Sequence, residues 1–437
     1  MTDRAKFTGV ARSTIAVLML SVFMVSMGFG IVLPVLPFLI ERLLGPGGDA
    51  AQVSRATGLL TGLYMLSLFL FAAAWGRLSD RYGRRTILLI GLIGFSATSL
   101  TFAFIENLPA IYAERFLSGF FAAAVTPVAL AAIGDLAASE ASRARHLTFV
   151  SLAGVGGFLL GPMMGVFIAR SAATFSPILS NVGPLTLPLA GTALLALLAA
   201  VATMLTIPRK TASEGSPERD RKAVLQPDKW LIPRLLALAF IVSAGIGVFE
   251  VGLALRGKQE LGLTPYQIAI MFTECSLVML IVQAIVFSPW VRPEVTRWFI
   301  VPALAILAAG LFLVPRASDF TLMLVVIGAV AASAGIISPI LTYWISSKAG
   351  KAQGGELGKQ TAAASLGAAF GSAAGGLLFE VVWLPNASFV LVTALTVVGL
   401  LLSLSLPRKL VTRKSYKADR GRDSANDTPA PAPMNTQ

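Results

Sequence analysis

The sequence contains very few residues of the kinds that bind metals or form disulfides. Among its 437 residues it has a single cysteine, Cys275, and a single histidine, His146. One cysteine excludes an internal disulfide framework and a cysteine-ligated metal cluster, and one histidine excludes a histidine-rich metal site. We therefore expect no metal site, and few parts remain for an enzyme's catalytic cluster.

Charged residues are scarce as well. They make up 13% of the chain, whereas a soluble domain carries about 25%. So few charges cannot cover a surface that faces water, which excludes a soluble globular protein. The sequence also lacks a P-loop for nucleotide phosphates, which disfavours ATP as an energy source within this chain.

The sequence is instead rich in long runs of hydrophobic residues. Hydrophobic residues make up 56% of the chain and its mean hydropathy is +0.78. Each apolar run is close to the ~20 residues that a membrane-spanning helix needs. We therefore predict an all-α integral membrane protein with twelve transmembrane helices. The runs cover residues 13–40, 57–75, 86–105, 109–134, 147–169, 185–206, 232–256, 266–289, 298–315, 319–346, 360–382 and 386–406.

The positions of the charges predict an orientation. If the twelve runs alternate in direction, the termini and the loops on their side, together with Arg234 at the start of the seventh run, hold 28 of the 35 Lys and Arg residues. Basic loops are retained in the cytoplasm, so we expect a multi-pass protein of the plasma (inner) membrane with both termini cytoplasmic. The net charge of +13 then reflects topology and weak attraction to anionic lipid rather than binding of nucleic acid.

The chain divides into two similar halves. We predict an N-terminal six-helix bundle over residues 1–206, a solvated cytoplasmic linker over 207–230, a C-terminal six-helix bundle over 231–406 and a disordered cytoplasmic tail over 407–437. Gly30 in the first half corresponds to Gly247 in the second, and Gly157 and Gly161 correspond to Gly371 and Gly375. Internal repeats of this kind predict a pseudo-two-fold axis with a substrate path between the halves.

One polar hairpin lies between the second and third runs. Its sequence is Gly76-Arg77-Leu78-Ser79-Asp80-Arg81-Tyr82-Gly83-Arg84-Arg85. This pattern resembles the signature loop between helices 2 and 3 of the major facilitator superfamily of transporters. The resemblance implies a gate at the cytoplasmic ends of the two halves. It would be built from the loop residues Gly76, Asp80, Arg81, Gly83, Arg84 and Arg85 together with Asp135 at the end of helix 4.

The gate has a specific predicted geometry. Asp80 and Arg84 would pair with Asp135, and Asp80 could face the N-terminus of helix 11. Gly76 and Gly83 would be needed for a tight turn. The alternative is that these charges only set the topology.

Two further segments resemble the drug:proton antiporter branch of the same superfamily. In helix 5, Gly157, Gly161, Pro162 and Gly165 form the pattern Gly-x-x-x-Gly-Pro-x-x-Gly, in which small residues permit close helix contact. Thr148 and Val166 depart from glycines of that motif. Helix 1 has prolines that should break its outer half, and it lacks the acidic residue that many relatives keep there.

Arg115 in helix 4 matches a superfamily arginine implicated in proton coupling. A charge in the middle of a span costs about 2.5–3.5 kcal/mol on insertion scales, so it needs a partner or a wet cavity. The alternative is an arginine whose side chain extends outward to the interface. We expect its neighbour Glu114 to be peripheral, because adjacent residues on a helix do not face each other.

Two acidic residues, Glu250 and Glu274, lie inside predicted spans of the second half. A carboxyl group within a membrane is a candidate proton carrier or a counter-charge for a cation. Glu250 could instead lie at the outer interface and pair with Arg256. For Glu274 the functional interpretation is favoured.

The sequence therefore predicts a secondary active transporter and not an enzyme. The first hypothesis is proton-coupled efflux of a small amphipathic organic solute, of the multidrug type, by alternating access. It would use the proton gradient and no cofactor, act on a small-molecule substrate within the lipid bilayer, and function as a monomer. The second is a sugar or metabolite facilitator without proton coupling. A channel or a membrane scaffold fits less well.

Overall fold

The protein is described here by a computed structural model. The residues that it describes are 2–45, 47–136, 140–175, 186–207, 230–286, 288, 293–348, 353–381 and 384–410. The predicted linker, apart from residues 207 and 230, and the tail from residue 411 onward lie outside these residues. Within them every regular element is helical.

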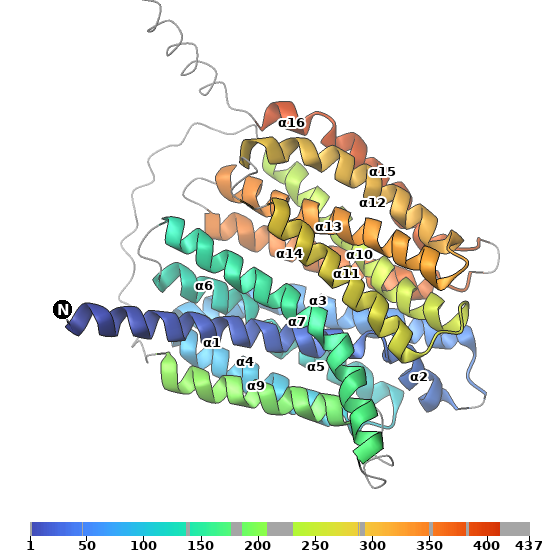
Figure 1. Ribbon diagram of the computed structural model, residues 1–437, viewed down its shortest axis with the longest axis horizontal. Coiled ribbons are helices and arrows are strands. Elements are labelled where there is room, and N and C mark those ends of the chain that lie inside the picture. Colours follow the sequence, from blue (N-terminus) through green and yellow to red (C-terminus); the bar gives the residue numbers. More distant parts are fainter. Residues whose placement is uncertain are drawn as a thin grey trace, which may run out of the picture.

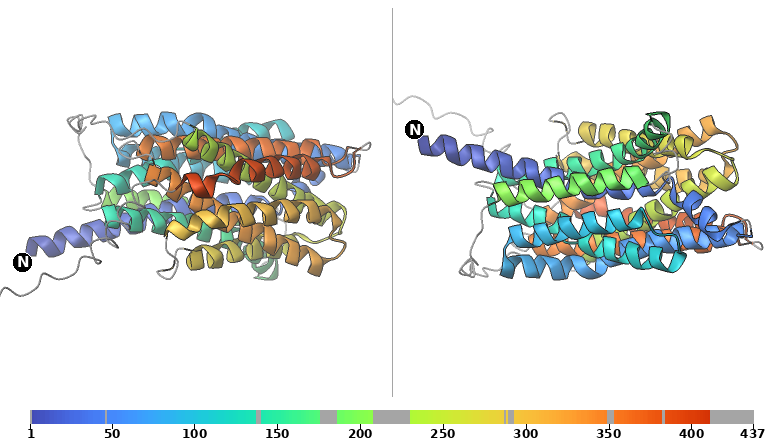
Figure 2. Two further views of the ribbon diagram at one scale, coloured as in Figure 1. Left: turned by 90° about the horizontal axis from the view of Figure 1, so that it is seen from above. Right: turned by 90° about the horizontal axis from the view of Figure 1, so that it is seen from below.

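Long helices run approximately along one axis of the molecule (Figure 1; Figure 2). The elements of the first half are α1 (Thr2–Val32), α2 (Leu36–Leu44), α3 (Ala50–Tyr82), α4 (Arg84–Phe102), α5 (Leu108–Ala122), α6 (Thr126–Leu136), α7 (Glu140–Phe175) and α9 (Thr186–Thr206). Those of the second half are α10 (Leu231–Gln259), α11 (Pro265–Val286), α12 (Ile300–Leu313), α13 (Phe320–Lys348), α14 (Gln353–Leu377), α15 (Ala387–Ser403) and α16 (Leu406–Lys409), with short 3₁₀ turns at Pro293–Phe299 and Val314–Arg316.

In the part of the chain that the structure describes, the helices account for twelve crossings. Ten described segments are long and apolar enough to span a membrane, with α5 and α6 together forming one of them, Leu108–Asp135. The apolar helix α15 has 17 residues, and the glycine- and alanine-rich α14 has 25. The predicted twelve-helix fold is therefore confirmed.

Prolines explain two of the helix breaks. α1 ends at Val32 and α2 begins at Leu36, with Pro37 in its first turn, because proline lacks the backbone N–H that an uninterrupted helix would use. The predicted break in helix 1 is confirmed. α5 ends at Ala122 and α6 begins at Thr126, just before Pro127.

Buried side chains form two hydrophobic cores. One is built mainly from α1–α9 and the other mainly from α10–α16. A few side chains pack in the core of the other group: Val251 and Leu255 of α10 belong to the first core, and Leu33 belongs to the second. The two groups of helices therefore pack directly against each other.

The bundle has two ends that carry different charged residues. The basic end carries the loop from Arg77 to Arg85, and the far end carries Glu41 at the end of α2 and Lys258 at the end of α10.

Candidate functional site

A cavity of about 240 Å³ lies where the two groups of helices meet. Its walls come from α1, α7, α10, α11 and α13, and they are largely apolar and aromatic. Glu250 of α10 is the one acidic residue among them. The lining residues are Phe29, Gly154, Val155, Phe158, Ile246, Phe249, Glu250, Phe272, Cys275, Ser276, Met279, Val330, Ala331 and Ala334.

Aromatic side chains from both groups meet at this cavity. Phe158 of α7 makes an edge-to-face contact with Phe272 of α11, with ring centroids 6.4 Å apart. On its other side Phe158 stacks against Phe29 of α1, with centroids 6.0 Å apart. Apolar pockets with a few polar groups are the usual form of small-molecule sites, so this cavity could hold an apolar ring close to a carboxyl group.

The two candidate carboxyl groups have different surroundings. Glu250 lines the cavity, and Arg256, its predicted partner at the interface, instead pairs with Glu260 and donates to the carbonyl of Ala317. That predicted pairing is wrong because Arg256 is nearly two helical turns further along α10, at its end. Burial raises the pKa of the Glu260 carboxyl above its ordinary value, an effect that Arg256 partly offsets.

Glu274 does not line the cavity. It faces α13, where a Cβ added at Gly328 would lie 3.6 Å from its Oε1 atom. Its Oε2 atom is buried and has no hydrogen-bond partner among the residues that the structure describes. A buried oxygen without a partner costs free energy, which makes this carboxyl group a candidate for a role beyond packing.

Arg115 is buried, and its partner is Glu114. The Arg115 Nε atom donates to Glu114 Oε2 over 2.7 Å and Nη2 donates to Oε1 over 3.0 Å. Both residues are 4% exposed. The expectation of a peripheral Glu114 is wrong, because two long side chains can bend toward each other from adjacent positions when burial leaves no water to solvate them.

Aromatic rings complete the surroundings of Arg115. Its guanidinium lies 4.2 Å from the ring centroid of Phe102 and 5.8 Å from that of Tyr64. The Tyr64 ring stacks against Phe29, with centroids 5.1 Å apart. Arg115 is thus connected to the cavity through Tyr64 and Phe29 rather than lining it.

The charge cluster predicted at the basic end is formed. Arg84 pairs with Asp80 over 2.6 Å and with Asp135 over 3.0 Å, and it donates to the Ser79 hydroxyl. These residues belong to α3, α4 and α6, which all lie in the first half. In the described residues, no ion pair joins this cluster to α14, so its role as a gate between the halves stays a prediction.

The two loop glycines differ. Gly83 joins α3 to α4 with φ of 88°, in the left-handed region that favours glycine. Gly76 instead lies within α3, and a Cβ added there would have nothing within 4 Å. The predicted need for a tight turn is therefore confirmed at Gly83 and wrong at Gly76. Arg81 stacks over the Tyr82 ring.

The helix-5 glycines hold α7 against α1. A Cβ at Gly161 would lie 2.6 Å from the Met27 carbonyl oxygen, and one at Gly165 would lie 3.1 Å from Ile31. At Gly157 it would collide with the carbonyl of Phe23. Pro162 lies inside α7 without ending it and approaches Gly30 of α1. Small residues thus permit the close α1–α7 contact.

The same contact recurs between α10 and α14, and it corrects the predicted repeat. Gly367 packs against the carbonyl of Phe240, which is the contact that Gly157 makes with Phe23 in the first half. Likewise, Gly371 packs against the carbonyl of Ala244, as Gly161 does against that of Met27. Gly157 therefore corresponds to Gly367, and Gly161 to Gly371, one helical turn earlier than predicted. Glycines recur every four residues in α14, so the sequence alone permits this slip.

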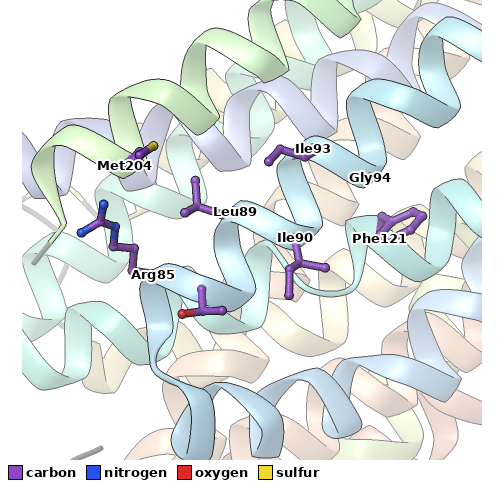
Figure 3. A pocket seen from close by; sticks show the side chains of 8 residues that line it. Arg85, Leu89, Ile90, Ile93, Gly94, Phe121 and Met204 are labelled. Atoms are coloured by element: carbon purple, nitrogen blue, oxygen red, sulfur yellow. The ribbon is translucent and has the colours of Figure 1, made fainter. Parts of the chain in front are cut away.

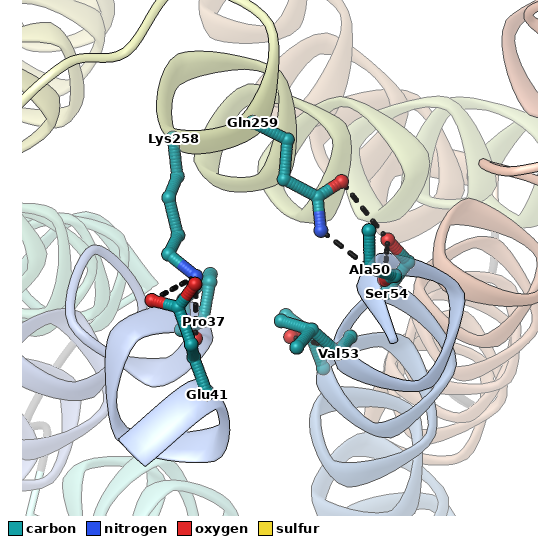
Figure 4. A network of polar contacts seen from close by, with 8 residues as sticks. Pro37, Glu41, Ala50, Val53, Ser54, Lys258 and Gln259 are labelled. Atoms are coloured by element: carbon teal, nitrogen blue, oxygen red, sulfur yellow. Dashed lines mark hydrogen bonds and ion pairs between the residues drawn. The ribbon is translucent and has the colours of Figure 1, made fainter. Parts of the chain in front are cut away.

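At the far end, the two groups are closed against each other. A Cβ at Gly58 of α3 would lie 2.5 Å from the Cα of Gly376 in α14. Beside this contact Lys258 pairs with Glu41 over 2.7 Å and donates to the Pro37 carbonyl (Figure 4).

Gln259 adds two more links there. Its amide nitrogen donates to the Ala50 carbonyl over 3.2 Å, and its side-chain oxygen accepts from the Ser54 hydroxyl over 3.1 Å (Figure 4). Glu41, Lys258 and Gln259 belong to none of the candidate sites predicted from the sequence. A signal was present, because Glu41 and Lys258 are 217 positions apart, the same spacing as Gly30 and Gly247.

Comparison with known proteins agrees with this architecture. The chain is 28% identical over 402 residues to multidrug resistance protein 1 of Bacillus subtilis, covering 90% of this chain and 96% of that one. It is 26% identical to the quinolone resistance protein NorA of Staphylococcus aureus, covering 84% and 90%. The crystal structure of a D-xylose–proton symporter superposes with a TM-score of 0.71 at 15% identity, over 90% of this chain and 97% of that one.

The sequence model of the Major Facilitator Superfamily matches residues 18–358 of this chain. With its twelve crossings, the polar loop between α3 and α4 and the repeated glycine contacts, the chain is a multi-pass membrane transporter that belongs to the Major Facilitator Superfamily.

Proposed function

We propose that this transporter exports a small amphipathic organic solute in exchange for protons. The observation that carries the proposal is Glu250, a carboxyl group in the wall of an otherwise largely apolar, aromatic cavity between the two groups of helices. An apolar wall suits the rings of an amphipathic solute, and a carboxyl group can bind either a proton or a cationic group of the solute. The names of the relatives, a multidrug and a quinolone resistance protein, support efflux.

In this mechanism the cavity opens alternately to the two sides. The contacts at the far end, from Gly58–Gly376 to Glu41–Lys258, close that side. The Arg84 cluster remains within one half. Both features support a state whose cavity faces the basic end, which the arginine count assigns to the cytoplasm. Solute would bind there, and rocking of the halves would release it outside while a proton replaces it on Glu250.

The test is transport in proteoliposomes of the full chain. A panel of cationic dyes, quinolones and sugars is supplied with and without a pH gradient. We expect dye or quinolone transport that rises with the gradient, and we expect Glu250→Gln to remove this dependence while the protein still folds. Equal transport under both conditions would reject proton coupling.

A facilitator without proton coupling is the second candidate. It is favoured by the absence of any acidic residue in residues 13–40, where the resemblance to the drug:proton antiporter branch leads us to expect one. Sugar transport that ignores the pH gradient, with no transport of the dyes, would establish this function instead.

A further inference from the structure

A second hollow lies on the outer surface of the first half, away from the cavity. This groove of about 490 Å³ runs between α4, α5 and α9, and α4 and α9 lie at the edge of the bundle farthest from α12 and α15 (Figure 1). Figure 3 shows its side chains. The lining residues are Arg85, Thr86, Leu89, Ile90, Ile93, Gly94, Phe121 and Met204.

The walls of the groove face the surroundings of the protein. Ile90, Ile93 and Met204 are 42%, 51% and 58% exposed. In a protein that spans a membrane, such apolar side chains at this depth contact lipid rather than water. An acyl chain can therefore lie along this groove.

Arg85 stands at the mouth of the groove and differs from the other loop arginines. Arg84 is held by Asp80 and Asp135, and Arg77 donates to the carbonyl of Ala73 in its own helix. The Arg85 side chain extends from α4 toward the part of α9 that carries Met204 (Figure 3). In the described part of the chain, no carboxylate forms an ion pair with it, and no acidic residue lines the groove.

The length of the groove matches one leaflet. From Arg85 to Gly94 the helix rises about 14 Å at 1.5 Å per residue, which is about half of the ~30 Å hydrocarbon core. At the Gly94 level the ring of Phe121 packs so closely that no Cβ could be added. The lining of the groove thus begins with the cation Arg85 and ends where Phe121 packs on Gly94, about half the thickness of the hydrocarbon core away along α4.

We propose that this groove binds an anionic phospholipid of the leaflet at the basic end. The phosphate would bind the Arg85 guanidinium, whose planar donors suit a phosphate in bidentate geometry, and one acyl chain would lie between α4 and α9. Because no carboxylate of the described residues pairs with Arg85, its positive charge favours an anionic headgroup over a zwitterionic one, and the described lining offers no carboxylate for a choline group. The proposal does not depend on what the protein transports.

The first test counts retained lipid. The full chain is exposed in detergent to equal amounts of phosphatidylglycerol and phosphatidylcholine with identical acyl chains, and bound lipids are counted by native mass spectrometry. We expect the wild type to retain phosphatidylglycerol preferentially, and Arg85→Gln to lower the ratio of the two lipids about fivefold. The matched control is Arg77→Gln, which removes the same charge from the same end of the bundle but outside the groove and should keep the wild-type ratio. An equal fall in both variants would overturn the proposal.

The second test locates the acyl chain. Phosphatidylglycerol with a photoreactive group in its acyl chain should label peptides of α4 and α9, and Met204→Trp should reduce this labelling by filling the groove while Arg85 stays in place. Labelling spread evenly over the lipid-facing helices would overturn the proposal. Binding of the cation tetraphenylphosphonium offers a further check. If this cation binds the groove more tightly after Arg85→Gln than before, the groove is an entrance for cationic solutes, and the proposal is overturned.

Discussion

Glu41 and Lys258 form an ion pair of 2.7 Å between two positions that the internal repeat makes equivalent. They are 217 residues apart, as are Gly30 and Gly247, which make matching contacts with α7 and α14. Opposite charges at equivalent positions therefore meet across the pseudo-two-fold axis and join α2 to α10. Lys258 is largely buried by this contact, whereas the Glu41 side chain is 60% exposed.

Reversal of either charge in this pair should open the far end. Lys258→Glu would place two carboxylates together. Because the Glu41 side chain is 60% exposed, we take the range of surface ion pairs, about 0.2–1 kcal/mol, and expect an increase of a few fold in the population open at the far end. Thr57, buried in α3, can report this opening as Thr57→Cys in a Cys275→Ser background, through its rate of labelling by an impermeant maleimide.

The double variant Glu41→Lys with Lys258→Glu provides the control, because it restores opposite charges in the reverse order. We expect its labelling rate to return close to that of the reporter background. A rate equal to that of the single variants would show that the ion pair does not hold the far end closed.

The glycine contact between α3 and α14 should be needed for the same closure. Gly376→Ala places a Cβ 2.6 Å from the Cα of Gly58, and overpacking of this kind costs about 1–3 kcal/mol. We expect faster maleimide labelling of Thr57→Cys and slower transport. Gly358→Ala is the matched change on the same helix, where nothing lies within 4 Å, and it should behave as the wild type. Similar effects of both changes would mean that helix propensity, not contact, is responsible.

The Glu114–Arg115 pair should stabilise the fold only as a pair. Glu114→Ala leaves a buried guanidinium without its partner, which costs about 3–5 kcal/mol, so we expect a clearly lower melting temperature in detergent. Replacing both residues by leucine removes the uncompensated charge, and this double variant should melt at a higher temperature than Glu114→Ala. A double variant that is the less stable of the two would contradict this explanation.

Glu274 should affect the driving force and not solute binding. Because it lies against Gly328 of α13 and outside the cavity, we expect Glu274→Gln to lower transport driven by a pH gradient while the dissociation constant of a fluorescent dye stays unchanged. Gln283 on the same helix offers a control, as Gln283→Ala should alter neither quantity. Weaker dye binding in Glu274→Gln would place this side chain at the solute instead.

The crossings and the polar loop could be predicted from the sequence because both depend on local properties. A run of about 20 apolar residues can satisfy its backbone hydrogen bonds in lipid only as a helix, so each span is specified by its own residues. The break in helix 1 follows from prolines within that segment, and the turn at Gly83 follows from the glycine itself. Arg84, Asp80 and Asp135 were predicted to pair from their resemblance to a known loop.

The tertiary structure decided which side chains meet. Lipid and protein interior are both apolar, so hydrophobicity does not show which face of a helix is turned to a neighbour, and only packing shows that Glu250 lines the cavity while Glu274 faces α13. Because glycines recur at four-residue intervals in α14, the sequence permits two alignments of the repeats that differ by one helical turn. The contact of Gly367 with the Phe240 carbonyl shows which alignment is correct. The sequence by itself determined the number of membrane crossings and the location of the charged loop, because each follows from a short segment. The cavity, the Glu114–Arg115 pair and the closed far end depend on burial and on contacts between distant segments, which exist only after the helices have packed.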